Sequence, residues 1–158
     1  MDERVIAEFG KEKTTPAFVF DTDVLRDNVS KLKNTFEHTA KLCYAMKANP
    51  FIIKEIEDLV PYFEVCSPGE HKICKRAGID VSKIVISGVN KEYSDIEEAI
   101  CDGITIFTIE SIAHFELLQK LTRKHIITKK ISLHIAEIFF SNQKLFCKLL
   151  LVSICHQR

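Results

Sequence analysis

The chain has 158 residues, of which 46% are hydrophobic and 28% charged, with five glycines and four prolines. This is an ordinary globular composition, so it excludes a collagen-like, low-complexity or wholly disordered chain. The 22 basic and 22 acidic residues balance, and without a basic excess the chain is not expected to bind nucleic acid or an anionic membrane. A complete eight-fold α/β barrel needs roughly 200–250 residues, so the chain is too short for one.

The charge is unevenly distributed along the sequence. Residues 1–116 carry 14 basic and 21 acidic residues, whereas residues 117–158 carry eight basic residues and one acid, Glu137. No glycine follows Gly103, although turns and helix ends in a βα chain usually need glycine. We therefore expect residues 137–158 to be an atypical tail of the kind that out-of-frame translation produces. An authentic half-barrel that pairs with another chain is the alternative.

Cysteine usage and the terminal segments favour a cytoplasmic protein. The six cysteines form no Cys-x-x-Cys pair and no zinc spacing with histidines, so we expect reduced thiols and no metal site. The acidic N-terminus lacks the apolar segment of a secretory signal. In the tail, the uncharged run at 149–155 is much shorter than the ~20 residues of a membrane-spanning helix.

Short β-branched runs alternate with helical patterns along the chain. Strands are predicted at 41–47, 63–67, 83–87, 104–109 and 130–135, and the first four begin 22, 20 and 21 residues apart. Amphipathic stripes predict helices in the segments 24–36, 52–60, 73–77, 96–100 and 112–121. Such a repeat implies parallel strands joined by right-handed crossovers. Periodicity alone leaves open whether they form a doubly wound sheet or part of a barrel.

Local signals predict where several helices begin and end. Ser94 with Glu97 has the spacing of a capping box that opens a helix. Gly78 and Gly103 stand where helices should stop, and Pro68 suits the first turn of a helix.

The carboxyl ends of the strands are where either arrangement would carry its chemistry. Lys47 is the unusual residue there, because burying an ammonium is costly unless it is paired or loses its proton. The sequence leaves two interpretations of Lys47. It is either a strand-edge lysine that reaches water or a catalytic amine.

Five segments in register then resemble one family. They are Tyr44-Ala45-Met46-Lys47-Ala48-Asn49, Thr15–Asp21, Ser67-Pro68-Gly69-Glu70, Lys83–Lys91 and Thr108–Ser111. Together they resemble the pyridoxal 5'-phosphate (PLP) dependent amino-acid decarboxylases of the alanine-racemase-like fold. The resemblance implies an α/β fold: an incomplete (β/α)8 TIM-type barrel of four to five βα units, without the C-terminal part of the barrel and the β-domain. The implied organisation is an extension at 1–13, a partial PLP-binding barrel at 14–136 and the tail at 137–158.

The same resemblance implies a function and a set of site residues. Lys47 would be the catalytic residue that forms the internal Schiff base with PLP, from a desolvated position at the barrel mouth. Glu64 stands where the family usually has an aspartate near the cofactor, and His134 where it generally has an arginine, so both are expected to bind cofactor. Ala48 and the Ser67–Glu70 turn favour diaminopimelate decarboxylase, and hence lysine biosynthesis. The alternative is an ornithine or arginine decarboxylase of polyamine biosynthesis.

Other polar residues of the repeats are expected to be structural. Ser87 and Asn90 would stabilise a turn, Glu110 and Ser111 would cap the next helix, and four histidines would be exposed or satisfied by hydrogen bonds: His38, His71, His114 and His125.

The family's glycine-rich phosphate loop and later parts have no counterpart in the sequence. We therefore expect this chain alone not to be a competent enzyme, although by resemblance it belongs to a carboxy-lyase that acts on a small amino acid. A non-enzymatic PLP-binding or interaction module, or a truncated relic, is the further alternative. Open barrel edges predict self-association or a homodimer.

Overall fold

The computed structural model describes residues 3–12, 20–36, 40–124, 131–135 and 151–154. Its helices are α1 (Glu3–Glu12), α2 (Thr22–Phe36), α3 (Ile53–Ile56), α4 (Pro68–Ala77), α5 (Tyr93–Cys101) and α6 (Ile112–Lys124), with short 3₁₀ helices at Pro50–Ile52 and Val81–Lys83. Its strands are β1 (Cys43–Ala45), β2 (Tyr62–Val65), β3 (Ile84–Ile86), β4 (Ile106–Ile109), β5 (Ile131–Ile135) and β6 (Leu151–Ile154).

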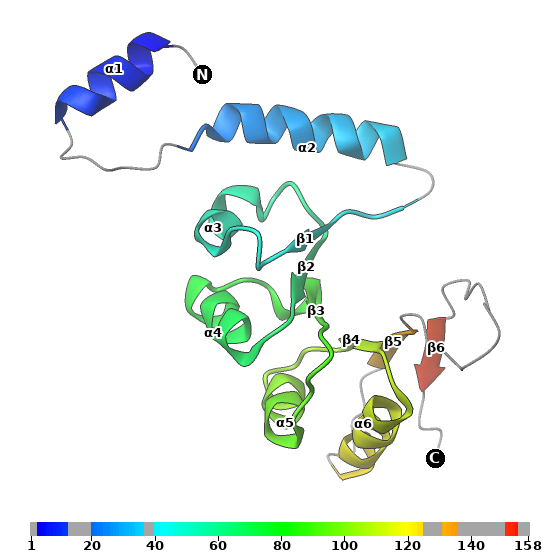
Figure 1. The fold of residues 1–158 in the computed structure, drawn as a ribbon. Coiled ribbons are helices and arrows are strands. Elements are labelled where there is room, and N and C mark those ends of the chain that lie inside the picture. The colour runs from blue at the N-terminus through cyan, green and yellow to red at the C-terminus, as the bar shows by residue number, and fades with distance from the viewer. Residues whose placement is uncertain (1–2, 13–19, 37–39, 125–130, 136–150, 155–158) are drawn as a thin grey trace, which may run out of the picture.

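The strands form one curved sheet in chain order. Neighbouring strands from β1 to β5 pair in parallel, and helices α3 to α6 lie along one face of this sheet (Figure 1). Parallel strands joined through helices on one face are the architecture of a barrel wall. The predicted fold class, an incomplete (β/α)8 barrel, is therefore confirmed.

The last described strand departs from this pattern. β6 lies within the segment 137–158 and pairs antiparallel with β5, with Leu133 opposite Val152. A parallel strand would need a crossover that carries the chain back to the starting edge of the sheet, whereas an antiparallel one does not. The sequence analysis had assigned no strand to this segment.

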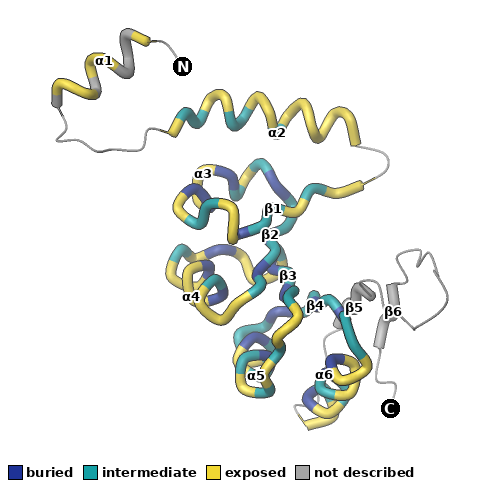
Figure 2. The backbone as a smooth tube through the Cα atoms, viewed as in Figure 1, coloured by how far each residue is buried: buried dark blue, intermediate teal, exposed yellow. Residues whose placement is uncertain are grey.

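The hydrophobic core lies between the sheet and helices α3 to α6. Alternate residues of the strands point into it, and they are fully or almost fully buried: Phe63, Val65, Ile84, Ile86, Phe107 and Ile109. Helices contribute Ile56, Cys74, Ile96, Leu118 and Leu121 from the opposite side. Figure 2 shows this burial concentrated where helices meet strands. Since strand side chains alternate between faces, the residues between these positions face the concave side, which the helices leave uncovered.

Helix α2 has no buried residue. Leu25 and Val29 only partly pack on the core, and Arg26 anchors the helix to the α3 region, through the Asp58 carboxylate at 3.0 Å and the Glu55 carbonyl at 3.1 Å. Among the described helices, none is long and apolar enough to cross a membrane.

The helix ends confirm some local predictions and correct others. Pro68 opens α4 and Gly78 ends it in the left-handed conformation at φ 66°, as predicted. The predicted capping box of Ser94 and Glu97 is wrong, because α5 begins at Tyr93 after Glu92 and Ser94 lies inside the helix.

A variant of the capping box does form one repeat earlier, at the start of α4, in which the amide before the N-cap residue takes the place of the N-cap amide. There the Ser67 hydroxyl accepts the Glu70 amide at 3.2 Å, and the Glu70 carboxylate accepts the Cys66 amide at 2.7 Å. The predicted helix at 52–60 is also shorter than its apolar stripe, since only α3 and the preceding 3₁₀ turn are helical there.

Candidate functional site

The register of the sheet places residues of successive strands in rows across its concave face. Ala45 pairs with Glu64, and Glu64 with Val85. One row nearer the carboxyl edge, Cys66 follows β2, Ser87 follows β3, and Thr108 pairs with His134. The Ser87 amide donates to the Val65 carbonyl at 2.8 Å, which continues the ladder beyond β3. The concave mouth is therefore lined by polar groups from three successive strands, β2 to β4, and the backbone of His134 continues their row in β5.

Lys47 lies in the turn that follows β1, at this same carboxyl edge. The segment leaves the sheet after the Met46 amide donates to the Glu64 carbonyl at 3.0 Å. Met46 is completely buried under the helices, whereas Lys47 is exposed. The expectation of a desolvated amine is thus not met in this chain. Within the described ranges, no strand lies beyond β1 to cover that side of the mouth.

Cys66 is a residue of the mouth on which the charge of Lys47 acts. Burial raises the pKa of the Cys66 thiol, and the carboxylates of Glu64 and Glu70 raise it further, while the Lys47 ammonium and a hydrogen bond with Ser87 act to lower it. The Lys47 ammonium therefore acts on the same thiol as the Glu64 carboxylate, with opposite sign. Cys66 is kept as a neutral thiol.

Glu64, the second predicted site residue, is half-buried in β2. Its carboxylate acts on both cysteines of the concave face: it contributes to raising the pKa of Cys66 and, after burial, to raising the pKa of Cys43 to about 11. Glu64 therefore supplies negative charge on the concave face of the sheet.

His134, the third predicted site residue, lies in β5 opposite Thr108. Its backbone therefore lies in the same row as Cys66, Ser87 and Thr108. The sheet brings Lys47, Glu64 and His134 to one edge, within two neighbouring rows. Two further histidines of the sequence analysis, His38 and His125, lie outside the described residues.

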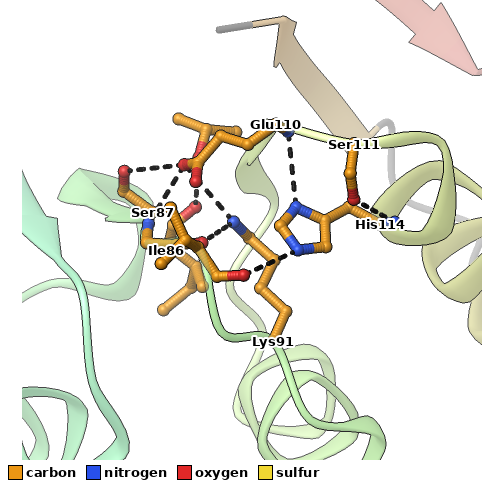
Figure 3. Close-up of polar contacts among 9 residues, drawn as sticks. Ile86, Ser87, Lys91, Glu110, Ser111 and His114 are labelled. Carbon is orange, nitrogen blue, oxygen red and sulfur yellow. Dashed lines mark hydrogen bonds and ion pairs between the residues drawn. The ribbon is translucent and has the colours of Figure 1, made fainter. Parts of the chain in front are cut away.

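Glu110 forms the most densely bonded group at the mouth (Figure 3). One of its carboxylate oxygens, Oε1, accepts the Thr108 hydroxyl at 2.9 Å, the Gly88 amide at 3.2 Å and the Ser87 hydroxyl at 3.5 Å. Burial acts to raise the pKa of this carboxyl, but the Thr108 hydrogen bond and the Lys91 ammonium hold it below its usual value. Glu110 therefore joins the end of β4 to the loop after β3. The prediction that it caps α6 is wrong, whereas Ser111 does cap α6 by accepting the His114 amide at 3.1 Å.

Lys91 is the buried cation of this group. Its side chain is 1% exposed, and its Nζ lies 3.5 Å from Glu110 Oε1 and donates to the Gly88 carbonyl. Burial lowers the pKa of Lys91, and Glu110 opposes that shift. The ammonium is thus bound by the Glu110 carboxylate and by the Gly88 carbonyl. These contacts tie together the β3–α5 loop (residues 87–92) and the end of β4.

His114 connects the same two segments from the first turn of α6. Its Nδ1 accepts the Glu110 backbone amide at 3.3 Å, and its Nε2 lies 3.1 Å from the Val89 carbonyl. Since a carbonyl can only accept, Nε2 must carry the proton and Nδ1 must not. Burial and the Lys91 ammonium lower the pKa of His114, which agrees with this neutral form.

A small hollow lies beside this cluster, between the first turns of α4 and α5. Its lining includes Cys66, His71, Ser87, Lys91 and Asp95. Its volume of about 30 Å³ is room for one or two water molecules. In the described ranges, no group of three or more His, Cys, Asp or Glu is arranged to hold a metal ion. A ligand of cofactor size would therefore lie on the open concave face.

Sequence reasoning missed Lys91, Glu110 and His114 as a connected group. Each has a local pattern that suggests something simpler: a loop lysine, a helix cap and a helix histidine. The available signal was that Lys91 ends the Lys83–Lys91 segment and Glu110 lies in the Thr108–Ser111 segment, two of the five segments that carry the family resemblance.

Comparison with known proteins identifies one family. The model of the family described as "Pyridoxal-dependent decarboxylase, pyridoxal binding domain" matches residues 22–146. A diaminopimelate decarboxylase from Neisseria meningitidis serogroup A is 33% identical over 124 residues, which is 77% of this chain and 30% of that protein. One from Aquifex aeolicus is 28% identical over 121 residues, 75% of this chain and 29% of that protein.

Solved structures show the same partial match. The diaminopimelate decarboxylase of Helicobacter pylori complexed with L-lysine superposes with a TM-score of 0.69 at 27% identity, over 81% of this chain and 33% of that one. A lysine/ornithine decarboxylase of Vibrio vulnificus complexed with putrescine gives 0.70 at 19% identity, over 84% and 35%, and shows a shared fold. The chain spans about a third of the length of these relatives.

Proposed function

Because this chain belongs to the pyridoxal-dependent decarboxylase family and matches its pyridoxal-binding domain, we propose that it is the N-terminal, PLP-binding part of a diaminopimelate decarboxylase-type enzyme. Lys47 is the residue that binds the aldehyde of the cofactor. The observation that carries the proposal is the position of Lys47, exposed in the turn at the carboxyl end of β1, where its ammonium acts on the thiol of Cys66.

The residues present fit the aldehyde end of PLP. An aldehyde needs an accessible primary amine. Lys47 is exposed, and within the described part of the chain its amine has no hydrogen bond or ion pair that would have to be broken. Lys91 is excluded from this role, because its Nζ is buried and bound to Glu110 and Gly88. Lys47 is therefore the amine of the mouth that can react.

Glu64 and His134 complete the proposed cofactor site. Glu64 contributes a carboxylate one row below the mouth, and the register of β5 supports a place for His134 in the mouth row. When PLP is bound, its conjugated ring accepts the electron pair that an amino acid releases as its α-carboxylate leaves as CO₂. The chain's own contribution is to hold the aldehyde at Lys47, to supply negative charge from Glu64 and to keep Cys66 protonated.

Activity is proposed to need more than these residues. The chain covers about a third of its relatives, and no glycine after Gly103 is available for a loop that cradles a phosphate with backbone amides. The open concave face, and the side of β1 on which the described residues place no further strand, favour association with another chain, either a second copy or the remaining part of such an enzyme. We place the protein in the cytoplasm, which its free cysteines Cys43, Cys66, Cys74 and Cys101 support.

Diaminopimelate is the proposed substrate class. The support is that three relatives, 33–34% identical over 68–77% of this chain, are named diaminopimelate decarboxylases, whereas the lysine/ornithine enzyme shares only the fold at 19% identity.

The experiment that tests cofactor binding uses the full chain. The protein is incubated with PLP, reduced with borohydride and digested, and the pyridoxyl group is located by mass spectrometry. We expect labelling of Lys47 well above that of Lys54, an exposed lysine of α3 that serves as the internal comparison. Lys47→Arg should remove the label, and Lys54→Arg should leave it. Labelling spread evenly over exposed lysines would overturn the proposal.

The second arm concerns catalysis. Release of CO₂ from diaminopimelate, L-ornithine and L-arginine is measured for the chain alone and together with the remaining portion of a relative. Selective labelling of Lys47 with CO₂ release only in the reconstituted form would support an incomplete enzyme. Selective labelling without release in either form would instead indicate a PLP-binding module.

A further inference from the structure

The ring of His114 has one nitrogen that must accept a hydrogen bond and one that must donate one. Nδ1 has to accept from the Glu110 amide, and Nε2 has to donate to the Val89 carbonyl. Only the neutral imidazole protonated at Nε2 meets both demands. A second proton would go to Nδ1, where it would face the Glu110 N–H, so both groups would be donors and that hydrogen bond would be lost.

The two segments that His114 joins are the β3–α5 loop and the end of β4. Lys91 and Glu110 connect the same segments, through the Gly88 carbonyl and amide. These two are also the charged groups that act on the ring, Lys91 from the loop and Glu110 from the strand end. Burial and the Lys91 ammonium disfavour a cationic imidazole, whereas the Val89 carbonyl and the Glu110 carboxylate favour it, and the net effect lowers the pKa of His114. Protonation would therefore break the hydrogen bond at Nδ1 in a site that disfavours the added charge.

The β3–α5 loop in turn contacts the mouth where Lys47 lies. Ser87 hydrogen-bonds with the Cys66 thiol, and Lys47 acts on that same thiol. Gly88 packs directly on the Cys66 carbonyl. A change in the position of residues 87–91 is therefore transmitted to Cys66 and to the neighbourhood of Lys47.

We propose that neutral His114 is a positioning residue, which fastens the β3–α5 loop to the end of β4 and so holds the mouth row beside Lys47, and that its protonation in mild acid releases the loop. The effect on Lys47 rests on the proposed function. The attachment of the β3–α5 loop to β4 by His114 can be measured without PLP. The direction of the pH dependence follows from the geometry. The loop is held at neutral pH and above, and it is released as pH falls below the ordinary pKa of histidine, about 6.5.

The decisive measurement is amide protection in the full chain by hydrogen exchange, corrected for intrinsic rates, from about pH 8 to about pH 5. We expect the Glu110 amide to lose protection in the acid range, by about tenfold per pH unit once His114 begins to titrate. Leu118 on the buried side of α6 should show no such dependence. In the same samples, NMR of the His114 ring should show the form protonated at Nε2 at pH 8.

The matched variant is His114→Gln. The glutamine amide can donate to Val89 as Nε2 does, but it does not titrate, so the acid loss of protection at Glu110 should disappear. His71→Gln changes another buried histidine, which pairs with Asp102 at 3.3 Å, and it should keep the acid transition at Glu110.

Lys47 provides the functional measurement. The ratio of pyridoxyl labelling at Lys47 to that at Lys54 should fall with the acid transition in the parent chain and stay constant in His114→Gln. An exchange profile at Glu110 that is flat in the parent, or a transition that persists in His114→Gln, would overturn the proposal, as would a ring protonated at Nδ1. Absence of Lys47 labelling at every pH would count against the proposed function, while the exchange data would still decide the fastening.

Discussion

A β-carbon placed on Gly88 would lie 2.8 Å from the carbonyl oxygen of Cys66. Gly88 also has φ 96°, a conformation that other L-residues rarely adopt. The loop after β3 therefore approaches the end of β2 too closely for a side chain at position 88.

Gly88→Ala is expected to destabilise the fold by about 2–4 kcal/mol, from the left-handed backbone and the contact with a main-chain oxygen. Denaturant unfolding measures this change. Gly69→Ala is the control, because its nearest neighbour would be the Ser67 hydroxyl at 3.8 Å and alanine favours the helix. Equal stabilities of the two variants would show that residues 87–89 relax freely.

The buried pair of Lys91 and Glu110 predicts strong non-additivity. Lys91→Met leaves the Glu110 carboxylate buried without its cation, which is expected to cost about 3–5 kcal/mol. The double variant Lys91→Met with Glu110→Gln removes both charges and should recover much of that loss. A double-mutant cycle by urea unfolding tests this, and additive losses would contradict the ion pair.

The same pair predicts a pH dependence. Since the folded pKa of Glu110 is held below its usual value, its contribution to stability is present above the ordinary glutamate range, near pH 4.3, and is lost as pH falls through the lower folded value. Lys91→Met should raise the pKa of Glu110 and move this loss to higher pH. Carboxyl NMR of Glu110 follows the titration, and an unchanged midpoint would sink the prediction.

The capping box of α4 predicts a coupled pair at Ser67 and Glu70. Ser67→Ala should cost about 1 kcal/mol through loss of the hydrogen bond to the Glu70 amide. Glu70→Ala should cost a similar amount by freeing the Cys66 amide, and Glu70→Gln, which retains an acceptor, should cost less. Thermal unfolding of the three variants provides the comparison. Equal losses for Glu70→Ala and Glu70→Gln would show that charge, rather than the hydrogen bond, matters.

Two phenylalanines test where the core lies. Phe107 is completely buried between the sheet and the helices, whereas Phe51 is 93% exposed after the Lys47 turn. Phe107→Ala is expected to cost about 3–5 kcal/mol, and Phe51→Ala less than about 0.5 kcal/mol. Denaturant midpoints distinguish them. A large loss for Phe51→Ala would mean that it packs on a second chain in solution, which a concentration dependence of unfolding would reveal.

Local sequence patterns were sufficient for the strands and for the position of Lys47. β-branched runs alternate with amphipathic stripes at a nearly constant spacing, and each predicted strand overlaps an observed one, because burial under covering helices demands that pattern. Parallel strands bring their carboxyl ends to one edge, so the sequence alone predicts Lys47 and Glu64 at that edge, whereas His134 is assigned only through the family resemblance.

Only the tertiary structure decided which polar residues contact one another. Glu110 has the sequence environment of a helix cap, yet its carboxylate bonds to Gly88 and lies beside Lys91, about one βα repeat earlier in the chain. The Ser94–Glu97 pattern resembles a capping box, but the helix starts before it, whereas Ser67 and Glu70 cap α4 together through the amides of Glu70 and Cys66. Such contacts depend on strand register and burial, and these arise from packing between segments. The sequence by itself therefore determined the order of elements and the edge that carries Lys47. Packing decided that Lys47 is exposed and that Lys91, Glu110 and His114 close the neighbouring loop.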